Sequence, residues 1–284
     1  MSLWDHDEID PYFMELMVSD REGRGGFPPD VAANIMRLSL LHAAQEKPDK
    51  IKDIWDASAT AFVNFKPQPL TEWINPTDTL IDALQKINLP CTPAAFFEAI
   101  ETGNRTALAL FIDAKINTDI RDNRGWTPLM AAAFRGQNKI IDLLIRHGAE
   151  INAIDSGGNT ALHWAAFSGH TDCARQLIAH SASIDLRNHF GWTPLIQAAA
   201  RNHAEVVSLL ISSGVNLDTC ANDGYTALHK AAELGYGEIA QLLLARGANP
   251  DLANSEENTP LKLAIKNKQD EMVKLLTSVP NNPA

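Results

Sequence analysis

Residues 125–133 read GWTPLMAAA, and the pattern returns four times at intervals of 33 residues without insertion: GNTALHWAA (158–166), GWTPLIQAA (191–199), GYTALHKAA (224–232) and ENTPLKLAI (257–265). Self-similarity at a fixed period of this length is typical of repeat architectures, in which each unit stacks on its neighbours. Five matches in one phase therefore predict an array of similar units over more than half of the chain.

Each unit reads as two short helices. Thr127 followed by Pro128 indicates a helix start, because a threonine oxygen can accept an unpaired amide and proline suits the first helical position. In the second half of the unit, Ile140, Leu143 and Leu144 fall on one helical face. A lone unit cannot bury that face, so stacking is expected.

Glycines recur at several positions of the period, and two of these positions indicate local structure. Gly148, Gly214 and Gly247 follow the second helix, where a left-handed residue commonly ends a helix, and Ser181 takes that place in one unit. A second set precedes each threonine in turn-forming strings such as N-R-G and N-D-G. The sequence thus predicts a turn, a helix, a second helix and a left-handed end in each unit.

These residues resemble the ankyrin repeat family, in its G-x-T-P-L-H-x-A-A-x-x-G-H and V-x-L-L-L-x-x-G-A motifs. The resemblance covers roughly residues 121–278. It implies an all-α solenoid of helix–turn–helix units, with short β-hairpin loops that project as fingers beside a concave groove. It also implies that the variable residues of the fingers and of the first helices contact a partner protein.

We expect an ankyrin-repeat domain at 88–278, made of a degenerate repeat at 88–120 and repeats at 121–278, followed by a loose tail at 279–284. The degenerate repeat fits a two-helix pattern over Phe96–Ala114. In the last unit Glu257 and Lys268 replace two glycines, and its lysines give it the polar outer side that a terminal repeat needs.

Residues 1–87 stand outside the period and form a predicted helical N-terminal region. Apolar spacing suggests helices near Tyr12–Val18, from Asp30 to about Gln45 and over Ile51–Phe65, and a fourth that starts at Asn75-Pro76. Phe27-Pro28-Pro29-Asp30, followed by Ile35 and Leu38, resembles the opening of an F-box, a segment that binds an adaptor subunit of ubiquitin ligases. Two readings stay open: an F-box-like segment near residues 27–41, or a helical cap on the end of the solenoid.

Composition narrows the function classes. The chain has 284 residues and a net charge of −11; residues 1–90 hold 15 acidic and 8 basic residues. Such acidity disfavours non-specific binding to nucleic acid or anionic membranes, so neither is an expected partner. Three scattered cysteines indicate free thiols in a reducing compartment. With no long apolar run and no basic leader, we expect a cytoplasmic protein, or one delivered into a host cell if its source is bacterial.

Signs of chemistry are few. The chain has no H-E-x-x-H, G-x-x-x-x-G-K-[ST], G-x-S-x-G or G-x-G-x-x-G string, so we predict no enzyme and no catalytic, cofactor-binding or metal-binding residues. His163 and His229 occupy the H of the repeat motif, where local hydrogen bonding is expected. His147, His170, His180 and His203 are expected near helix ends, where a partial positive charge is favourable.

The leading hypothesis is a monomeric protein-interaction module. Its alternatives are a ubiquitin-ligase adaptor or host-directed bacterial effector that uses the F-box-like segment, and a small enzyme within residues 1–87. Aromatic and arginine side chains are common among binding hot spots. The predicted partner-binding residues are Arg124, Trp126, Phe134, Arg135, Asn159, Phe167, Phe190, Trp192, Arg201, Asp223, Tyr225 and Glu233.

Overall fold

The computed structural model describes residues 77–122 and 124–278, and within them every regular element is a helix. Helix α4 spans Asp78–Gln85, and six pairs of helices follow it. The pairs are α5 (Pro93–Thr102) with α6 (Arg105–Asp113), α7 (Pro128–Phe134) with α8 (Asn138–Arg146), α9 (Ala161–Phe167) with α10 (Thr171–Ala179), α11 (Pro194–Ala200) with α12 (Ala204–Ser212), α13 (Ala227–Leu234) with α14 (Gly237–Leu244), and α15 (Pro260–Lys266) with α16 (Asp270–Ser278). The predicted all-α repeat fold is confirmed.

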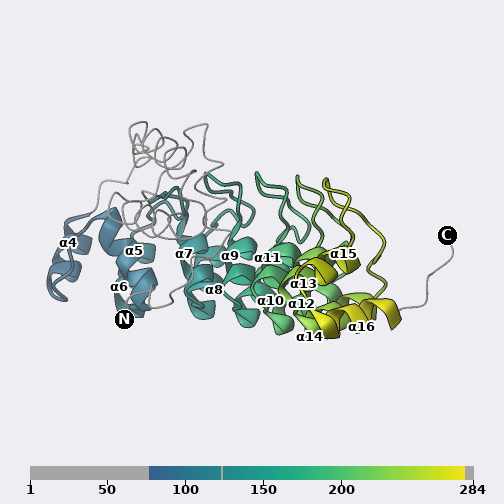
Figure 1. The fold of residues 1–284 in the computed structure, drawn as a ribbon. Coiled ribbons are helices and arrows are strands. Elements are labelled where there is room, and N and C mark those ends of the chain that lie inside the picture. Colours follow the sequence, from purple (N-terminus) through teal and green to yellow (C-terminus); the bar gives the residue numbers. More distant parts are fainter. Residues whose placement is uncertain (1–76, 123, 279–284) are drawn as a thin grey trace, which may run out of the picture. The chain divides into compact units, whose positions relative to one another are not determined.

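The pairs stack side by side in two rows. Figure 1 shows the first helices α7, α9, α11, α13 and α15 in one row and their partners α8 to α16 in the other, with the loops between pairs projecting beside the first row. Neighbouring first helices are in contact along the array, and so are neighbouring second helices. The core is therefore continuous from pair to pair, as expected for a repeat array.

The first helices are short, and those inside the array, α7, α9 and α11, are almost fully buried. A threonine caps the start of each of the first helices α7, α9, α11, α13 and α15. In α7, the Thr127 oxygen accepts the amide of Met130 at 3.3 Å. All seven residues of α9 are buried, and both Ala165 and Ala166 have no exposed surface. The small alanine side chains at these positions let the helices on either side approach closely.

The second helices bury only one side. In α12, Val206, Val207 and Leu210 are fully buried, whereas Glu205 and Ser208 are exposed. Burying each such apolar side chain stabilises the array by roughly 1.5–3 kcal/mol. Three of these helices are followed by a left-handed glycine, and Ser181 has the same conformation, with φ of 67°. The predicted place of Ser181 in the period is thus confirmed.

Short hairpin-like fingers join the pairs. In the finger after α8, the Asp155 amide donates to the Asn159 carbonyl at 2.9 Å and the Gly158 amide closes the turn on Asp155. Adjacent fingers are also joined, because the His189 amide donates to the Gly157 carbonyl at 3.0 Å. The hairpin closure is a single pair, so no strand forms in the part of the chain that the structure describes.

A side-chain ladder ties the bases of the fingers together. One Asp or Asn per unit accepts the amide of a residue 31 positions later, at 2.9–3.1 Å. The rungs are Glu150 to Asp119, Ser183 to Asn152, Asn216 to Asp185, and Asn249 to Asp218. Each unit therefore holds the next one by its backbone as well as by its core.

One expectation is wrong. Helix α4 begins at Asp78, with Thr77 as its cap, rather than at Asn75-Pro76, because the Thr77 oxygen accepts the Leu80 amide at 3.3 Å. Glu257 and Lys268, which replace glycines, keep the left-handed backbone, with φ of 60° and 57°. The other predicted N-terminal helices, the F-box-like segment and the tail at 279–284 lie outside the described residues.

Candidate protein-binding face

We call the surface formed by the fingers and by the first helices the finger-side face. An aromatic cluster occupies its part over α7 and α9. The ring of Phe134 lies 5.8 Å from Trp164 and 6.3 Å from Phe167, and Trp164 lies 5.6 Å from Phe167. Phe134 is half-buried, while Trp164 and Phe167 are 8% and 6% exposed. The cluster thus links two neighbouring units.

Two arginines lie on this cluster. The Arg201 guanidinium lies 4.3 Å above the Phe167 ring, and that of Arg135 lies 5.6 Å from the Phe134 ring. Arg135 also forms an ion pair with Glu101 at 3.3 Å, but its buried Nε has no hydrogen-bond partner within the described residues. Burial lowers the pKa of Arg201. A guanidinium over an aromatic ring is stabilised by the ring's electrons and keeps its planar edge for hydrogen bonding.

A second cluster surrounds Lys230 on α13. Its ammonium lies 4.2 Å from the Tyr225 ring, 5.3 Å from the Trp192 ring and 3.2 Å from a Glu233 oxygen. Burial, and then the charge of Glu233 among other acids, raises the pKa of Tyr225 to about 12. Lys230 was not among the predicted partner-binding residues. It occupies the same position of the period as Trp164, which was not predicted to bind a partner either.

A buried polar network lies beneath the fingers after α8 and α10. Asp155 accepts the Trp164 indole N–H at 3.0 Å and the Asn159 amide at 2.8 Å. Burial raises the pKa of Asp155, and these hydrogen bonds oppose that shift. The Asn159 oxygen in turn accepts from Asn188 at 2.8 Å and from Gln197 at 3.3 Å. Asn159 is 1% exposed, so its observed role is to hold two fingers together.

The other predicted residues divide by burial. Trp192 is 4% exposed; Phe190, Asp223, Tyr225 and Glu233 are half-buried. Arg124 and Trp126 belong to a different compact unit from the helix pairs. There the Arg124 guanidinium pairs with Asp122 at 2.6 Å and lies 4.1 Å above the ring of Trp126, which is 8% exposed.

The motif histidines make the local hydrogen bonds that were expected, and they also link successive units. His163 Nδ1 accepts the Thr160 amide at 3.2 Å, so its Nε2 carries the proton and donates to the Trp192 carbonyl at 3.1 Å. His229 repeats the arrangement with Thr226 and Asn258. Burial lowers the pKa of His163 to about 4 and also lowers that of His229.

Two histidines were assigned to the wrong kind of helix end. His170 and His203 are the residues that precede α10 and α12, where a positive charge is unfavourable. His203 Nε2 lies 2.9 Å from the Phe167 carbonyl, and burial lowers its pKa. His147 and His180 follow α8 and α10, as the charge argument requires.

The described residues offer little for metal binding, nucleophilic catalysis or membrane insertion. They contain no group of three or more His, Cys, Asp or Glu side chains that could hold a metal ion. Burial, with a smaller contribution from Asp172, raises the pKa of the Cys173 thiol to about 12. A thiol with so high a pKa is a poor nucleophile at neutral pH. No helix among residues 77–122 and 124–278 is long and apolar enough to cross a membrane.

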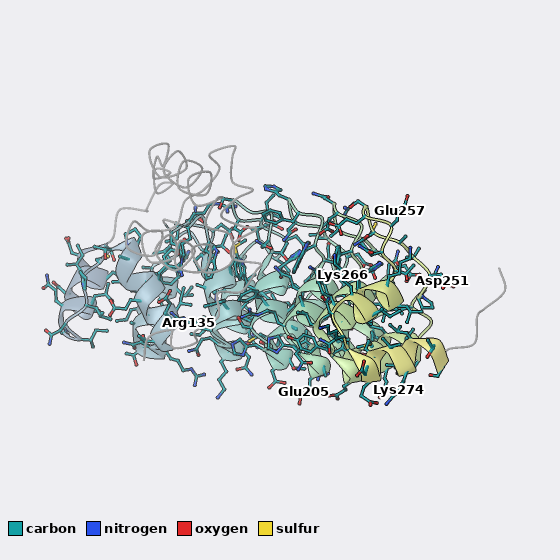
Figure 2. The ribbon with its side chains drawn as sticks, viewed as in Figure 1. Arg135, Glu205, Asp251, Glu257, Lys266 and Lys274 are labelled. Carbon is teal, nitrogen blue, oxygen red and sulfur yellow. The ribbon has the colours of Figure 1, made fainter. Side chains whose placement is uncertain are left out.

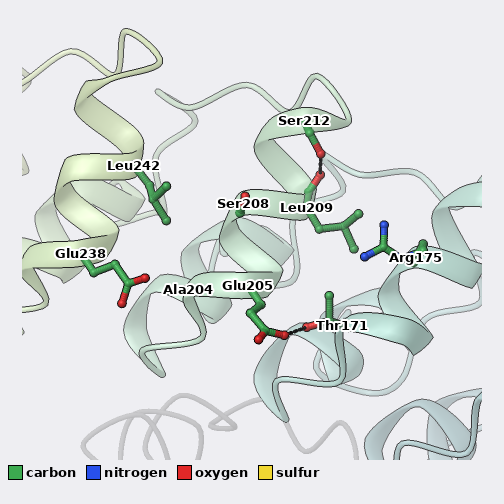
Figure 3. A pocket seen from close by; sticks show the side chains of 9 residues that line it. All are labelled: Thr171, Arg175, Ala204, Glu205, Ser208, Leu209, Ser212, Glu238 and Leu242. Atoms are coloured by element: carbon green, nitrogen blue, oxygen red, sulfur yellow. Dashed lines mark hydrogen bonds between the residues drawn. The ribbon is translucent and has the colours of Figure 1, made fainter.

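The outer side of the second row carries an open hollow of about 490 Å³. Figure 3 shows Glu205 and Thr171 facing each other across its floor, and the threonine hydroxyl donates to the carboxylate at 3.2 Å. The Ser212 hydroxyl is also occupied, because it donates to the Leu209 carbonyl. Two hydroxyls of the hollow thus already donate within the protein. The hollow therefore offers a ligand fewer hydrogen-bond donors than its residue types alone suggest.

Paired helices, glycine-closed fingers and a 33-residue period define a helical repeat protein of the kind that generally serves as a protein-interaction module. A family model described as ankyrin repeats (3 copies) matches residues 96–188 and 180–254. The chain therefore belongs to the ankyrin repeat family, whose members are typically not enzymes.

One curated relative carries a short stretch of the same kind. The potassium channel AKT2/3 of Arabidopsis thaliana is 39% identical to the chain over 56 residues, which is 20% of the chain and 7% of the channel. The shared stretch is thus a small part of the channel.

Proposed function

We propose that the finger-side face of residues 88–278 binds another protein, with residues 1–87 as a separate region. The observation that carries this proposal is that two sets of aromatic and charged contacts each join different units. One set joins Phe134, Phe167 and Arg201, and the other joins Lys230 to Trp192. Such side chains are frequent hot spots in protein interfaces. Partner specificity then lies in these side chains, because the fold alone does not determine it.

The proposed contact residues follow from exposure. Half-buried side chains can touch a partner while they keep their contacts within the array, whereas Asn159 and Trp192 support the face from below. The proposed contacts on the helical unit are Phe134, Arg135, Phe190, Arg201, Asp223, Tyr225, Lys230 and Glu233, with Phe167 contributing a ring edge. Arg124 and Trp126 lie in the other compact unit and are proposed as partner contacts of that unit by itself.

Affinity capture with the full chain tests the face. Phe190→Ser with Tyr225→Ser alters the fingers, and Leu209→Ser with Leu242→Ser makes the same kind of change in the outer hollow. We expect the wild type and the hollow variant to retain the same proteins, and the finger variant to lose them without a lower thermal unfolding temperature. Equal retention by all three would contradict the proposal.

A further inference from the structure

The last helix pair, α15 and α16, leaves uncovered the side that every earlier pair packs against its successor. Ile265 on α15 is 58% exposed, whereas the alanine at its position in each of the four preceding units has no exposed surface. Leu261 and Val273 are half-buried, although the residues at their positions in the same four units are buried. Within the described part of the chain, three apolar side chains at this end thus lack the cover that their counterparts have.

The charges at this end are divided between the two helices. Both charged residues of α15, Lys262 and Lys266, are basic, whereas the first turn of α16 carries Asp270 and Glu271. Figure 2 shows Lys266 on α15 and Lys274 on α16, at the C-terminal end of the array. Lys274 pairs with Glu271 at 2.7 Å, but no residue among 77–122 and 124–278 forms an ion pair with Lys266 or Asp270. One cation and one anion therefore remain available for a second molecule.

Side chains at these two positions reach the next unit where one follows. The Phe134 ring, at the position of Lys266, packs against rings of the following unit. The Thr171 hydroxyl, at the position of Asp270, donates to Glu205 of the following unit at 3.2 Å. Lys266 and Asp270 therefore lie at the edge where an element stacked on α15 and α16 would meet them.

From this arrangement we propose that two copies of the chain associate end to end, with α15 of each copy against α16 of the other. A two-fold axis makes the contact twice, because both copies use the same surface. Short loops join the helices of a pair, so α15 and α16 run antiparallel. Lys266 at the end of α15 then lies beside Asp270 of the partner subunit at the start of α16. Contact of α15 with α15 would instead bring the lysines of both copies together, which is unfavourable.

The apolar residues supply the centre of this contact. Leu261, Ile265 and Val273 become covered by the second copy, as their counterparts are by the next unit. A terminal repeat generally needs a polar outer face, and the lysines of the last unit supply only part of one. The chain then forms a dimer, in place of the monomer that the sequence suggested. None of the proposed partner contacts lies on α15 or α16, so the inference goes beyond the proposed function.

Analytical ultracentrifugation of the full chain tests the dimer. We expect a reversible monomer–dimer equilibrium over concentrations from about 1 to 100 µM. Ile265→Asp places a charge in the contact of both copies and should raise the dimer dissociation constant at least about a hundredfold. Leu234→Asp makes the same kind of change at an exposed leucine outside the contact and should leave the constant unchanged. A chain that stays monomeric at the highest concentration, or a dimer that tolerates Ile265→Asp, would overturn the inference.

Charge exchange tests the pairing of α15 with α16. Lys266→Asp and Asp270→Lys should each weaken the dimer by about tenfold or more, because like charges then meet twice in each dimer. An equimolar mixture of the two variants should dimerise again, since the mixed dimer restores an opposite pair at both places. Both residues are exposed, so thermal unfolding should show each variant folded. A mixture that dimerises no better than its components would overturn the proposed arrangement.

Discussion

The two rows of helices share one 33-residue period but differ in how much of each helix is buried. In the first row, α9 buries all seven of its residues between its neighbours. In the second row, α12 buries Val206, Val207 and Leu210 and exposes the opposite side. The first row therefore joins the units, whereas the second row supplies a one-sided core with a solvated exterior.

The difference teaches where a substitution should matter. Positions in the first row have neighbouring helices on both sides, so a change in size is opposed from two directions. Along a second-row helix, buried positions, where a substitution costs stability, alternate with exposed positions, where a substitution is tolerated. Four substitutions test this difference between the two rows, in decreasing order of expected effect.

Leu210→Ala tests the one-sided core of the second row. Leu210 has no exposed surface, so its loss should leave a cavity and lower the free energy of unfolding by about 2–5 kcal/mol. Its half-buried neighbour Leu209 is the control, and Leu209→Ala should cost no more than about 1 kcal/mol. Urea denaturation measures both, and equal losses would show that α12 is not one-sided.

His163→Met tests a buried group of the first row through pH. Burial lowers the His163 pKa from 6.5 to about 4, so the unfolded chain binds the proton more readily. Its stabilising contribution is present above pH 6.5 and is lost as pH falls towards 4, by about 3 kcal/mol at most. The variant should lose less stability between pH 7 and 4.5. Met130→His, at the same position of the preceding unit, should lose more stability than the wild type over this pH range. If neither variant changes the dependence of unfolding free energy on pH, the lowered pKa of a histidine at this position is wrong.

Ala198→Leu tests the crowding of the first row. Ala198 is fully buried on α11, so three added carbons must displace a neighbouring helix, at a cost of about 1–3 kcal/mol. Ala179, exposed near the end of α10, is the matched second-row position, and Ala179→Leu should stay within about 0.5 kcal/mol of the wild type. A tolerated Ala198→Leu in thermal unfolding would mean that the first row has room to spare.

Ser181→Gly tests the end of a second-row helix. Ser181 holds φ of 67°, which glycine adopts without the steric cost of a side chain, so the variant should gain about 1 kcal/mol. The reciprocal Gly214→Ser should lose about as much, because a side chain at Gly214 meets no atom within 4 Å and only its φ of 85° is unfavourable. Changes of the same sign for both variants in calorimetry would contradict this account.

The period was enough to predict the helix pairs from α7 to α16, because each unit repeats the same cap, core and end. It could not fix the start of α4, which stands outside the repeats. There Pro76 suits a first helical position, but the Thr77 oxygen accepts the Leu80 amide and sets the cap two residues further along. Competing start signals so close together cannot be ranked by spacing alone.

The candidate site was harder to predict than the fold. Asn159 and Tyr225 share one position of the period, yet Asn159 is buried by Asp155, Asn188 and Gln197. Lys230 was missed because it contacts Trp192, 38 positions earlier, through space and not through a motif. A repeat defines the position of a side chain, but its neighbours across units decide whether it faces solvent or supports the fold.

The ladder from Asp119 to Asn249 gives the array a mechanical direction. Each rung joins one unit to the next, so a pull on the ends loads the rungs in series and lets one terminal unit detach while the others remain intact. A detached unit of 33 residues releases roughly 110–120 Å of extended chain. Under force, the array should therefore unfold one repeat unit at a time, and its length should increase in steps of that size.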